Sequence, residues 1–306
     1  MLQQIINALY RHPLSRLKRY RRFGGYFSYR AMMRGSRQMM EASLQLPPVQ
    51  CYAQGLPVYF LTGKNYLYQT LFCIRSLVKF SSEEFQFILV DDGSFDHTLV
   101  AQIKKQLPGC TIVMQDEVDK NLQLLLPQQQ YPHLYQKRKV YPHLKKLTDI
   151  HTLAGSDWKL VLDSDMLFWD TPQEIIQWLK KPEQPMHMVD CVESYGYSRQ
   201  LMEKLSGHPV PSLLNVGAIG LNSTEINWSA LDNWMHVLEE KEGSSYYLEQ
   251  ALTAMLIGEQ QSTILNEDQY KVNPSLGDTK TPVLHHYVDL SKKYYYTQAW
   301  KKLINH

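Results

Sequence analysis

Short apolar runs alternate with helical stretches from residue 58 to residue 114, and this order constrains the fold more than any other feature. The strand-like runs are VYFLT (58–62), FQFILV (85–90) and CTIVM (110–114). Residues 66–80, between the first two runs, carry apolar side chains at helical spacing, and residues 96–107 form a second helical stretch. The order strand, helix, strand, helix, strand predicts an α/β fold with a mostly parallel sheet flanked by helices.

The remainder of the chain continues this pattern. A further helix is expected at 142–154, followed by a strand in the segment KLVLDSDMLF (159–168) that runs out at Leu162. Later apolar runs predict strands at 186–192 and 213–221. Residues 41–56 contain Pro47, Pro48 and Gly55 and are interpreted as a linker into the main domain.

Two acidic clusters follow predicted strands. Asp91 and Asp92 end one strand, and Asp163 and Asp165 end another. Side chains two residues apart in a strand point the same way, so Asp163 and Asp165 can aim their carboxylates at one point. Ligands of open α/β sheets bind outside the carboxyl ends of the strands, and paired carboxylates suit Mg²⁺ or Mn²⁺ with a substrate phosphate. The alternatives are a helix-capping loop at 163–165 and a plain Asp-Gly turn at 92–93.

Composition limits the class of protein. The chain has 306 residues and 44% hydrophobic content, as expected for one large α/β domain or two small ones with a real core. No apolar run approaches the ~20 residues that span a bilayer, and no signal peptide is evident. Four scattered cysteines without metal-type spacing (Cys51, Cys73, Cys110, Cys191) indicate reduced thiols and a cytoplasmic location.

The N-terminal segment differs from the rest in charge. Residues 1–40 hold nine Lys and Arg and no acid, whereas the whole chain has 32 basic and 30 acidic residues. Leu2, Ile5, Ile6 and Leu9 fall at helical spacing. We therefore predict a basic, partly helical extension over 1–50 and a main domain over 51–306. Such a segment can lie on the inner face of an anionic membrane. The alternative is a solvated helix packed on the body or partly disordered. No nucleic acid is expected, since no binding motif accompanies the charge.

From about residue 57 to residue 300 the chain resembles the nucleotide-sugar-dependent glycosyltransferases of the GT-A fold. ILVDDGSFD resembles their early strand and acidic turn, and VLDSDMLFWDTP resembles their DxD strand. The resemblance implies a Rossmann-like GT-A fold and a nucleoside diphosphate sugar as donor, with a UDP-sugar favoured. It also implies Mn²⁺ or Mg²⁺ held by Asp163 and Asp165, and a donor site that includes Asp91, Asp92 and Thr62.

Three later motifs fit the same resemblance. PSLLNVGAIGLN (211–222) resembles the segment that borders the sugar and the acceptor, with Asn215 as a catalytic candidate and Gly217 as a donor-binding one. YYLEQALTAML (246–256) resembles a helix start of glycogenin-like enzymes, which implies that Glu249 and Gln250 face the donor sugar. YPHLKKLTDIHTL (141–153) resembles the helix before the DxD strand. There Lys145 or Lys146 is a candidate for donor contact, although a solvated helix face is the favoured interpretation.

The C-terminal segment LHHYVDLSKKYYYTQAW (284–300) resembles the glycogenin-like pair in which a metal-binding histidine precedes a diphosphate-binding lysine by six residues. His286 and Lys292 have that separation. The chain departs from the pattern, because Asp289 stands where glycine is usual and Lys293-Tyr294 replaces Pro-Trp. His285 and Lys293 therefore remain alternates, and so does a surface histidine pair beside a basic tail.

These features predict a metal-dependent glycosyltransferase that transfers a sugar to an acceptor hydroxyl of a glycan, a lipid-linked molecule or a small molecule. The His286 and Lys292 spacing favours retention of configuration, whereas inversion would need a carboxylate base, for which Asp190, Glu193 and Glu249 are candidates. The alternatives are a sugar nucleotidyltransferase, or a non-catalytic glycan-binding or scaffold relative with a membrane-surface N-terminus.

Overall fold

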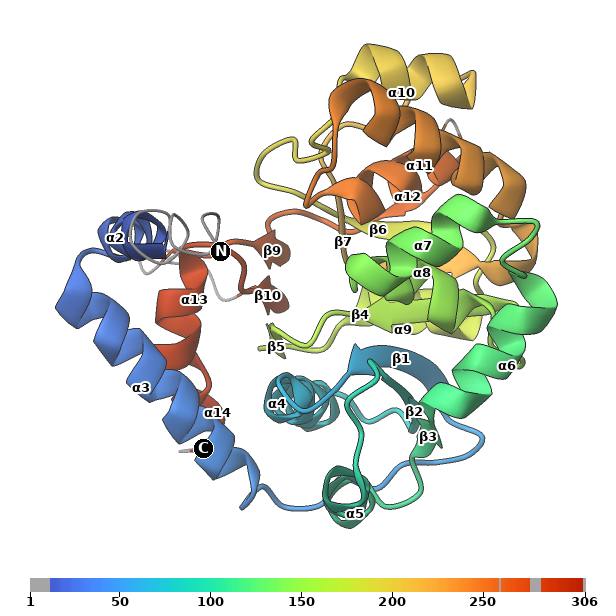
Figure 1. Ribbon diagram of the computed structural model, residues 1–306. Helices are drawn as coiled ribbons and strands as arrows, with labels where there is room; N and C mark the ends of the chain where they lie inside the picture. Colours follow the sequence, from blue (N-terminus) through green and yellow to red (C-terminus); the bar gives the residue numbers. More distant parts are fainter. Residues whose placement is uncertain (1–11, 259, 276–281, 305–306) are drawn as a thin grey trace.

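A seven-stranded sheet forms the centre of the computed structural model, which describes residues 12–258, 260–275 and 282–304 (Figure 1). The alternation predicted for residues 58–114 is present as β1 (Leu56–Thr62), α4 (Leu67–Lys79), β2 (Phe85–Asp91), α5 (His97–Gln106) and β3 (Thr111–Val113). β1 and β2 are parallel, with Leu56 opposite Phe85 and Thr62 opposite Asp91. Thr62 and Asp91 therefore end their strands at the same edge of the sheet.

The rest of the chain extends the sheet on the other side of β1. Its elements are, in chain order, α6 (Gln115–Leu125), α7 (Pro132–Val140), α8 (Leu144–His151), β4 (Trp158–Leu162), α9 (Gln173–Lys180), β6 (Met186–Val189), α10 (Arg199–Ser206), β7 (Leu214–Asn222), α11 (Trp228–Glu242), α12 (Leu248–Ile257) and β8 (Thr263–Ile264). The strand order is β3-β2-β1-β4-β7-β6-β8. β7 runs antiparallel to both of its neighbours, and the other pairs are parallel, so the sheet is mostly parallel as expected.

The strand before the two aspartates ends at Leu162, as predicted, and a second strand that was not predicted follows Asp165. This second strand, β5 (Met166–Phe168), belongs to a second sheet. That sheet has the order β5-β10-β9, with β9 at Tyr270–Val272 and β10 at Leu284–His286. The three residues Asp163, Ser164 and Asp165 bridge the two sheets, and the backbone N–H of Asp163 donates to the Gly217 carbonyl at 2.7 Å.

Two apolar layers cover the central sheet, and the alternation of β1 side chains explains why. Val58 and Phe60 point into a layer shared with α4, α5 and α9, whereas Tyr59 points into a layer shared with α8, α11 and α12. Successive strand side chains face opposite sides, so one strand contributes to both layers. Apolar β-branched and aromatic runs such as FQFILV are typical of such doubly covered strands.

The N-terminal helices are α2 (His12–Arg22) and α3 (Tyr26–Ser43). α3 packs against the end of the chain, whereas α2 packs against α3. Figure 1 shows α3 beside α13 (Ser291–Tyr294), with the π-helical turn η3 (Tyr295–Ala299) and α14 (Lys301–Ile304) following. The buried face of α3 carries Met32, Gly35, Met39 and Ser43, and Met39 packs in a cluster with Phe72 and Trp300.

The predicted helical spacing of residues 2–9 lies outside the described residues. No helix in the described part of the chain is both long and apolar enough to cross a lipid bilayer.

We expect Gly35→Ala to destabilise the protein. A Cβ atom at position 35 would lie 2.2 Å from the backbone oxygen of Tyr296, so α3 would have to move away from η3. Overpacking of this kind costs ~1–3 kcal/mol and outweighs the gain of up to ~1 kcal/mol that alanine brings to a helix. Urea unfolding measures the difference, with the exposed Gln38→Ala on the same helix as control. A Gly35→Ala variant as stable as the wild type would contradict this contact.

Candidate active site

The two sheets meet at the Asp163–Asp165 segment and bring a histidine to it. β4 delivers Asp163 at its carboxyl end, and β5 follows directly after Asp165. β10 pairs with β5 in antiparallel register, with His286 opposite Met166. A residue 121 positions from Asp165 in sequence therefore lies beside it, because the small sheet fixes the register of the two strands.

Asp163, Asp165 and His286 form a cluster of potential metal ligands. One ligand atom from each lies within 4.8 Å of the others. His286 Nε2 is 3.5 Å from Asp163 Oδ2 and 3.4 Å from Asp165 Oδ1. This nitrogen is buried and accepts or donates no hydrogen bond within the described structure. Two carboxylate oxygens and an imidazole nitrogen form a donor set suited to Mn²⁺ or Mg²⁺, so the residues fit the predicted ion.

Asn215 fixes the orientation of the His286 ring. Asn215 Oδ1 accepts from the Gly217 N–H at 2.9 Å, and Asn215 Nδ2 donates to Asp190 Oδ2 at 3.0 Å. His286 Nδ1 lies 3.1 Å from the same Asn215 oxygen and must donate, since that oxygen can only accept. In the neutral ring, a proton on Nδ1 leaves a lone pair on Nε2, the nitrogen that faces the two aspartates.

Gly217 leaves the space that the histidine ring occupies. A Cβ atom at position 217 would lie 2.4 Å from His286 Cε1 and Nδ1, and 2.6 Å from Met166 Cε. The only side chain small enough for this position in β7 is therefore hydrogen, which allows the backbone to approach the ring closely. Gly217 thus packs against the metal-ligand cluster, whereas the sequence assigned it to donor binding.

Lys146 connects Asp163 to the start of α12. Its Nζ lies 2.8 Å from Asp163 Oδ1 and 3.1 Å from Glu249 Oε1. Burial disfavours the charged amine, but the two carboxylates outweigh this and raise the Lys146 pKa well above its usual value. Burial also raises the pKa of Glu249 to about 7, although Lys146 opposes the shift. The expectation that the lysines of this helix face solvent is wrong for Lys146, because the ion pairs draw it into the site.

Lys292 pairs with the second aspartate. Its Nζ lies 3.0 Å from Asp165 Oδ2, and the negative charge of Asp165 raises the Lys292 pKa. Burial opposes ionisation of Asp165, but the charge of Lys292 and the neighbouring His286 together outweigh it and hold the Asp165 pKa well below its usual value. A partly exposed ammonium beside a metal-ligand cluster can also neutralise a phosphate.

His285 and Lys293, the alternates to His286 and Lys292, have other contacts. His285 Nδ1 is 3.1 Å from the Tyr287 hydroxyl, and its ring contacts Trp169 edge-on. Lys293 extends towards Gly24, at the turn between α2 and α3. Asp289, where glycine is usual in the resembling motif, adopts a φ of 45°. Asp is among the few non-glycine residues that enter this left-handed region readily, so the departure is compatible with the turn.

The acidic turn after β2 is held by its own side chains. Asp91 Oδ1 accepts from the backbone N–H groups of Gly93, Ser94 and Phe95 at 2.7–2.9 Å. The Asp92 side chain lies directly over Gly63, since an added Cβ there would meet its carboxylate at 2.0 Å. Asp91 thus shapes the turn, and Asp92 is the more open of the two.

Thr62 lies underneath the Asp163–Asp165 segment. Its hydroxyl is 2.8 Å from the Thr70 hydroxyl, which in turn is 2.8 Å from Ser164 Oγ. Thr62 is fully buried, so it supports the serine between the two aspartates. On the other side of the turn, Lys145 donates to the Asp92 carbonyl at 2.6 Å.

The carboxylates considered as bases have different surroundings. Asp190 accepts from Asn215 Nδ2, from Gln250 Nε2 at 3.2 Å and from the Cys191 N–H at 2.8 Å. Glu193 pairs with Arg199 at 3.0 Å. Glu249 reaches the cluster through Lys146, and Asp190 reaches it through Asn215. Glu193 has no such connection among the described residues. Gln250 also donates to the Ser194 carbonyl at 3.0 Å and so joins α12 to the Asp190 segment.

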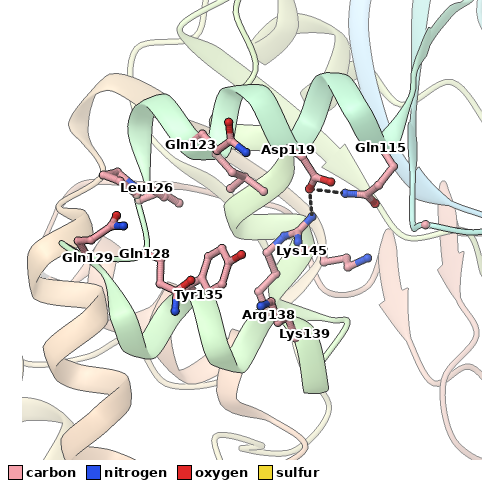
Figure 2. Close-up of a pocket in the computed structure, with 13 residues that line it drawn as sticks. Gln115, Asp119, Gln123, Leu126, Gln128, Gln129, Tyr135, Arg138, Lys139 and Lys145 are labelled. Atoms are coloured by element: carbon pink, nitrogen blue, oxygen red, sulfur yellow. Dashed lines mark hydrogen bonds and ion pairs between the residues drawn. The ribbon is translucent and has the colours of Figure 1, made fainter.

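A cavity of about 790 Å³ lies between α6 and α7 (Figure 2). Gln115, Asp119 and Arg138 meet in its wall, where Gln115 donates to Asp119 at 2.8 Å and Arg138 lies 3.7 Å from Asp119. Gly93 and Lys145 also line the cavity, whereas the metal-ligand cluster does not. The cavity therefore borders the acidic turn and is separate from the three ligand side chains.

Comparison with known proteins identifies the fold. No protein-family model matches the sequence, and no curated protein matches it in sequence. The structure is similar to the galactosyltransferase LgtC in complex with donor and acceptor sugar analogues, with a TM-score of 0.54 and 13% identity over 81% of this chain and 95% of that one. An active-site mutant of LgtC gives a TM-score of 0.51 and 14% identity over 76% and 86% of the two chains. Mouse xyloside xylosyltransferase 1 gives 0.49, with 14% identity over 78% and 98%. The chain has the GT-A fold of glycosyltransferases, which confirms the predicted fold.

Proposed function

We propose that this protein is a metal-dependent glycosyltransferase that moves a sugar from a nucleoside diphosphate sugar to an acceptor hydroxyl. The observation that carries the proposal is the buried His286 Nε2, whose lone pair faces Asp163 and Asp165 and has no hydrogen-bond partner in the described structure. A buried nitrogen without a hydrogen-bond partner lowers the stability of the folded protein unless a ligand binds to it. The GT-A fold supports the same function by analogy.

In this proposal Asp163, Asp165 and His286 hold Mn²⁺ or Mg²⁺, and the bound ion supplies Lewis-acid stabilisation of the diphosphate. Lys292 lies next to Asp165 and balances the negative charge that develops on the leaving group. Asp92 and the Gly93 turn position the nucleoside. Glu249 and Gln250, at the start of α12, lie on the side of the donor sugar, with Lys146 joining Glu249 to the metal ligands.

The donor is proposed to be a UDP-sugar and the acceptor a carbohydrate-type hydroxyl, with retention of configuration as the His286 and Lys292 spacing suggests. The proposed location is the cytoplasm, which agrees with four cysteines that are all free thiols. The proposed division into a 1–50 extension and a 51–306 catalytic domain follows the change in charge and rests on the sequence.

A donor screen tests the proposal. UDP- and GDP-sugars are added to the full chain with Mn²⁺, with Mg²⁺ or with EDTA, and melting temperature and free nucleotide are measured. We expect one sugar nucleotide to raise the melting temperature and to be slowly hydrolysed only when the metal is present. A ligand at a hundred times its Kd stabilises the native state by about 2.7 kcal/mol. The proposal fails if no sugar nucleotide stabilises the protein or if EDTA changes nothing. Product formed from a nucleoside triphosphate and a sugar phosphate would instead indicate the nucleotidyltransferase.

We expect Asn215→Ala to weaken Mn²⁺ binding by about 10–100-fold, because His286 loses the acceptor that fixes its tautomer and ring orientation. Mn²⁺ titration followed by melting temperature measures the change. Asn222→Ala, at the far end of the same strand, removes an amide that only caps the next turn and serves as the control. Equal Mn²⁺ affinity in Asn215→Ala and wild type would show that this hydrogen bond does not orient a metal ligand.

A further inference from the structure

One face of α3 is basic and exposed, and it points away from the rest of the fold. This basic face, defined here as Tyr26, Phe27, Arg30, Arg34 and Arg37, lies opposite the buried Met32, Gly35 and Met39. The three arginines recur at intervals of four and three residues and so share one side of the helix. All five side chains are exposed. This face is therefore a continuous strip on the outside of the molecule.

The arginines of this strip have no acidic partner in the described part of the chain. No ion pair involves Arg30, Arg34 or Arg37 among the residues that the structure describes, whereas Arg22 on α2 pairs with Asp289. The first acid of the chain is Glu41, so no carboxylate on α2 or on the preceding part of α3 offsets this charge. Three guanidinium groups on one helix face repel one another unless an anionic partner lies opposite.

The strip also exposes apolar side chains where the helix begins. Phe27 is 86% exposed, Tyr26 is 48% exposed, and Leu17 on the adjacent α2 is 46% exposed. The Tyr26 and Phe27 rings touch edge-on at 5.6 Å, and the Arg30 guanidinium lies 6.0 Å from the Tyr26 ring. Aromatic rings flanked by arginines are typical of segments that lie at the level of lipid headgroups.

The opposite side of α3 is attached to the segment that carries Lys292. α3 packs on η3 and α13, and Lys292 in α13 contacts Asp165. Ser36 Oγ and the Tyr68 hydroxyl, 3.0 Å apart, tie the same helix to α4. A ligand on the basic face would therefore bind to a helix that is packed on the body of the molecule rather than to a separate tail.

We propose that the basic face of α3 binds the surface of an anionic lipid bilayer. The arginines contact headgroup phosphates, and the Phe27 ring enters the boundary between headgroups and acyl chains. Charge alone would also suit a nucleic acid, but a phenylalanine that is almost fully exposed beside the arginines gains more from a bilayer, where its apolar ring leaves water. This binding requires no catalytic step and is independent of the proposed transferase activity.

Cosedimentation of the full chain with lipid vesicles tests the proposal. We expect binding to vesicles that contain phosphatidylserine, little binding to pure phosphatidylcholine, and release as the salt concentration rises above ~0.1 M. The triple variant Arg30→Gln/Arg34→Gln/Arg37→Gln should bind roughly a hundredfold more weakly, since each arginine contributes roughly a fivefold factor near an anionic surface. Phe27→Ser should weaken binding roughly tenfold while keeping the charge.

A matched variant separates this face from net charge. Lys120→Gln/Lys204→Gln/Lys241→Gln removes the same charge from exposed positions on α6, α10 and α11, which lie away from α3 in Figure 1. It should bind like the wild type, and circular dichroism should show all variants to be folded. The proposal is overturned if the arginine variant binds like the wild type, if both triple variants lose binding equally, or if the wild type binds single-stranded DNA but not anionic vesicles.

Discussion

Asp165→Ala is expected to abolish metal-dependent stabilisation by a sugar nucleotide and to lower donor hydrolysis by at least about a hundredfold. Replacing a residue that only supports a metal ligand already costs about 10–100-fold in affinity or activity, and Asp165 would be a ligand itself. The substitution also removes the partner that Lys292 contacts at 3.0 Å. The variant loses a metal ligand and the ion pair with Lys292 together, so its effect on donor hydrolysis should be the largest of any single change.

Asp170→Ala is the matched control for this variant. Asp170 lies five residues further along the same segment and is exposed, and among the described residues its side chain accepts only from the N–H of Thr171. Donor hydrolysis and metal-dependent melting should be unchanged in Asp170→Ala. If Asp165→Ala still responds to Mn²⁺ and donor like the wild type, the metal site lies elsewhere. If both variants lose activity equally, the segment is sensitive to any change and the assignment of Asp165 is unsupported.

Lys146→Met should be the most destabilising single change in the site. Glu249 and Lys146 are 6% and 7% exposed, so removing the amine leaves a buried carboxylate without its cation. Breaking a buried ion pair from one side costs ~3–5 kcal/mol, whereas replacing both partners by neutral groups costs far less. Lys146→Met/Glu249→Gln should therefore recover much of the loss. Urea unfolding of the single and double variants measures both.

The loss of unfolding free energy in Lys146→Met, relative to the wild type, should grow as pH rises. Glu249 has an ordinary pKa of 4.5 and a folded-state pKa of about 7, so the folded protein holds this proton more tightly than the unfolded chain. The stability linked to the proton is present below the unfolded pKa and is lost as pH rises through the folded pKa. Without Lys146 the folded pKa rises further, and the variant should lose more stability than the wild type between pH 5 and pH 8. A deficit that does not change over this interval would mean that Glu249 is not the group left unpaired.

Local patterns in the sequence predicted most of the central sheet. Apolar runs at 58–62 and 85–90 correspond to β1 and β2, because period and composition along a few residues report which faces are buried. The end of β4 at Leu162 was also predicted, whereas the separate strand β5 and its partner were not. Asp163 to Asp165 leave one sheet and enter another, and the partner of β5 is β10, more than a hundred residues away.

The site shows the same division between local and distant information. The spacing of Asp163 and Asp165 indicated a carboxylate pair, and their side chains do lie together with His286. The choice between His285 and His286 depended on the register of β10, since a shift by one residue exchanges the two faces of a strand. Lys146 was overlooked as a buried residue because its helix appears solvated in sequence, and only the positions of Asp163 and Glu249 draw it inward.

The amino-acid order alone sufficed for the α/β class, the acidic strand ends and the basic N-terminal segment, because each is a property of neighbouring residues. Folding in three dimensions was needed to give the partner of β5, the tautomer of His286 through Asn215, and the unpartnered face of α3. Each of these depends on contacts between residues far apart in the chain. Such contacts are selected by the total free energy of the packed molecule, which no local pattern records.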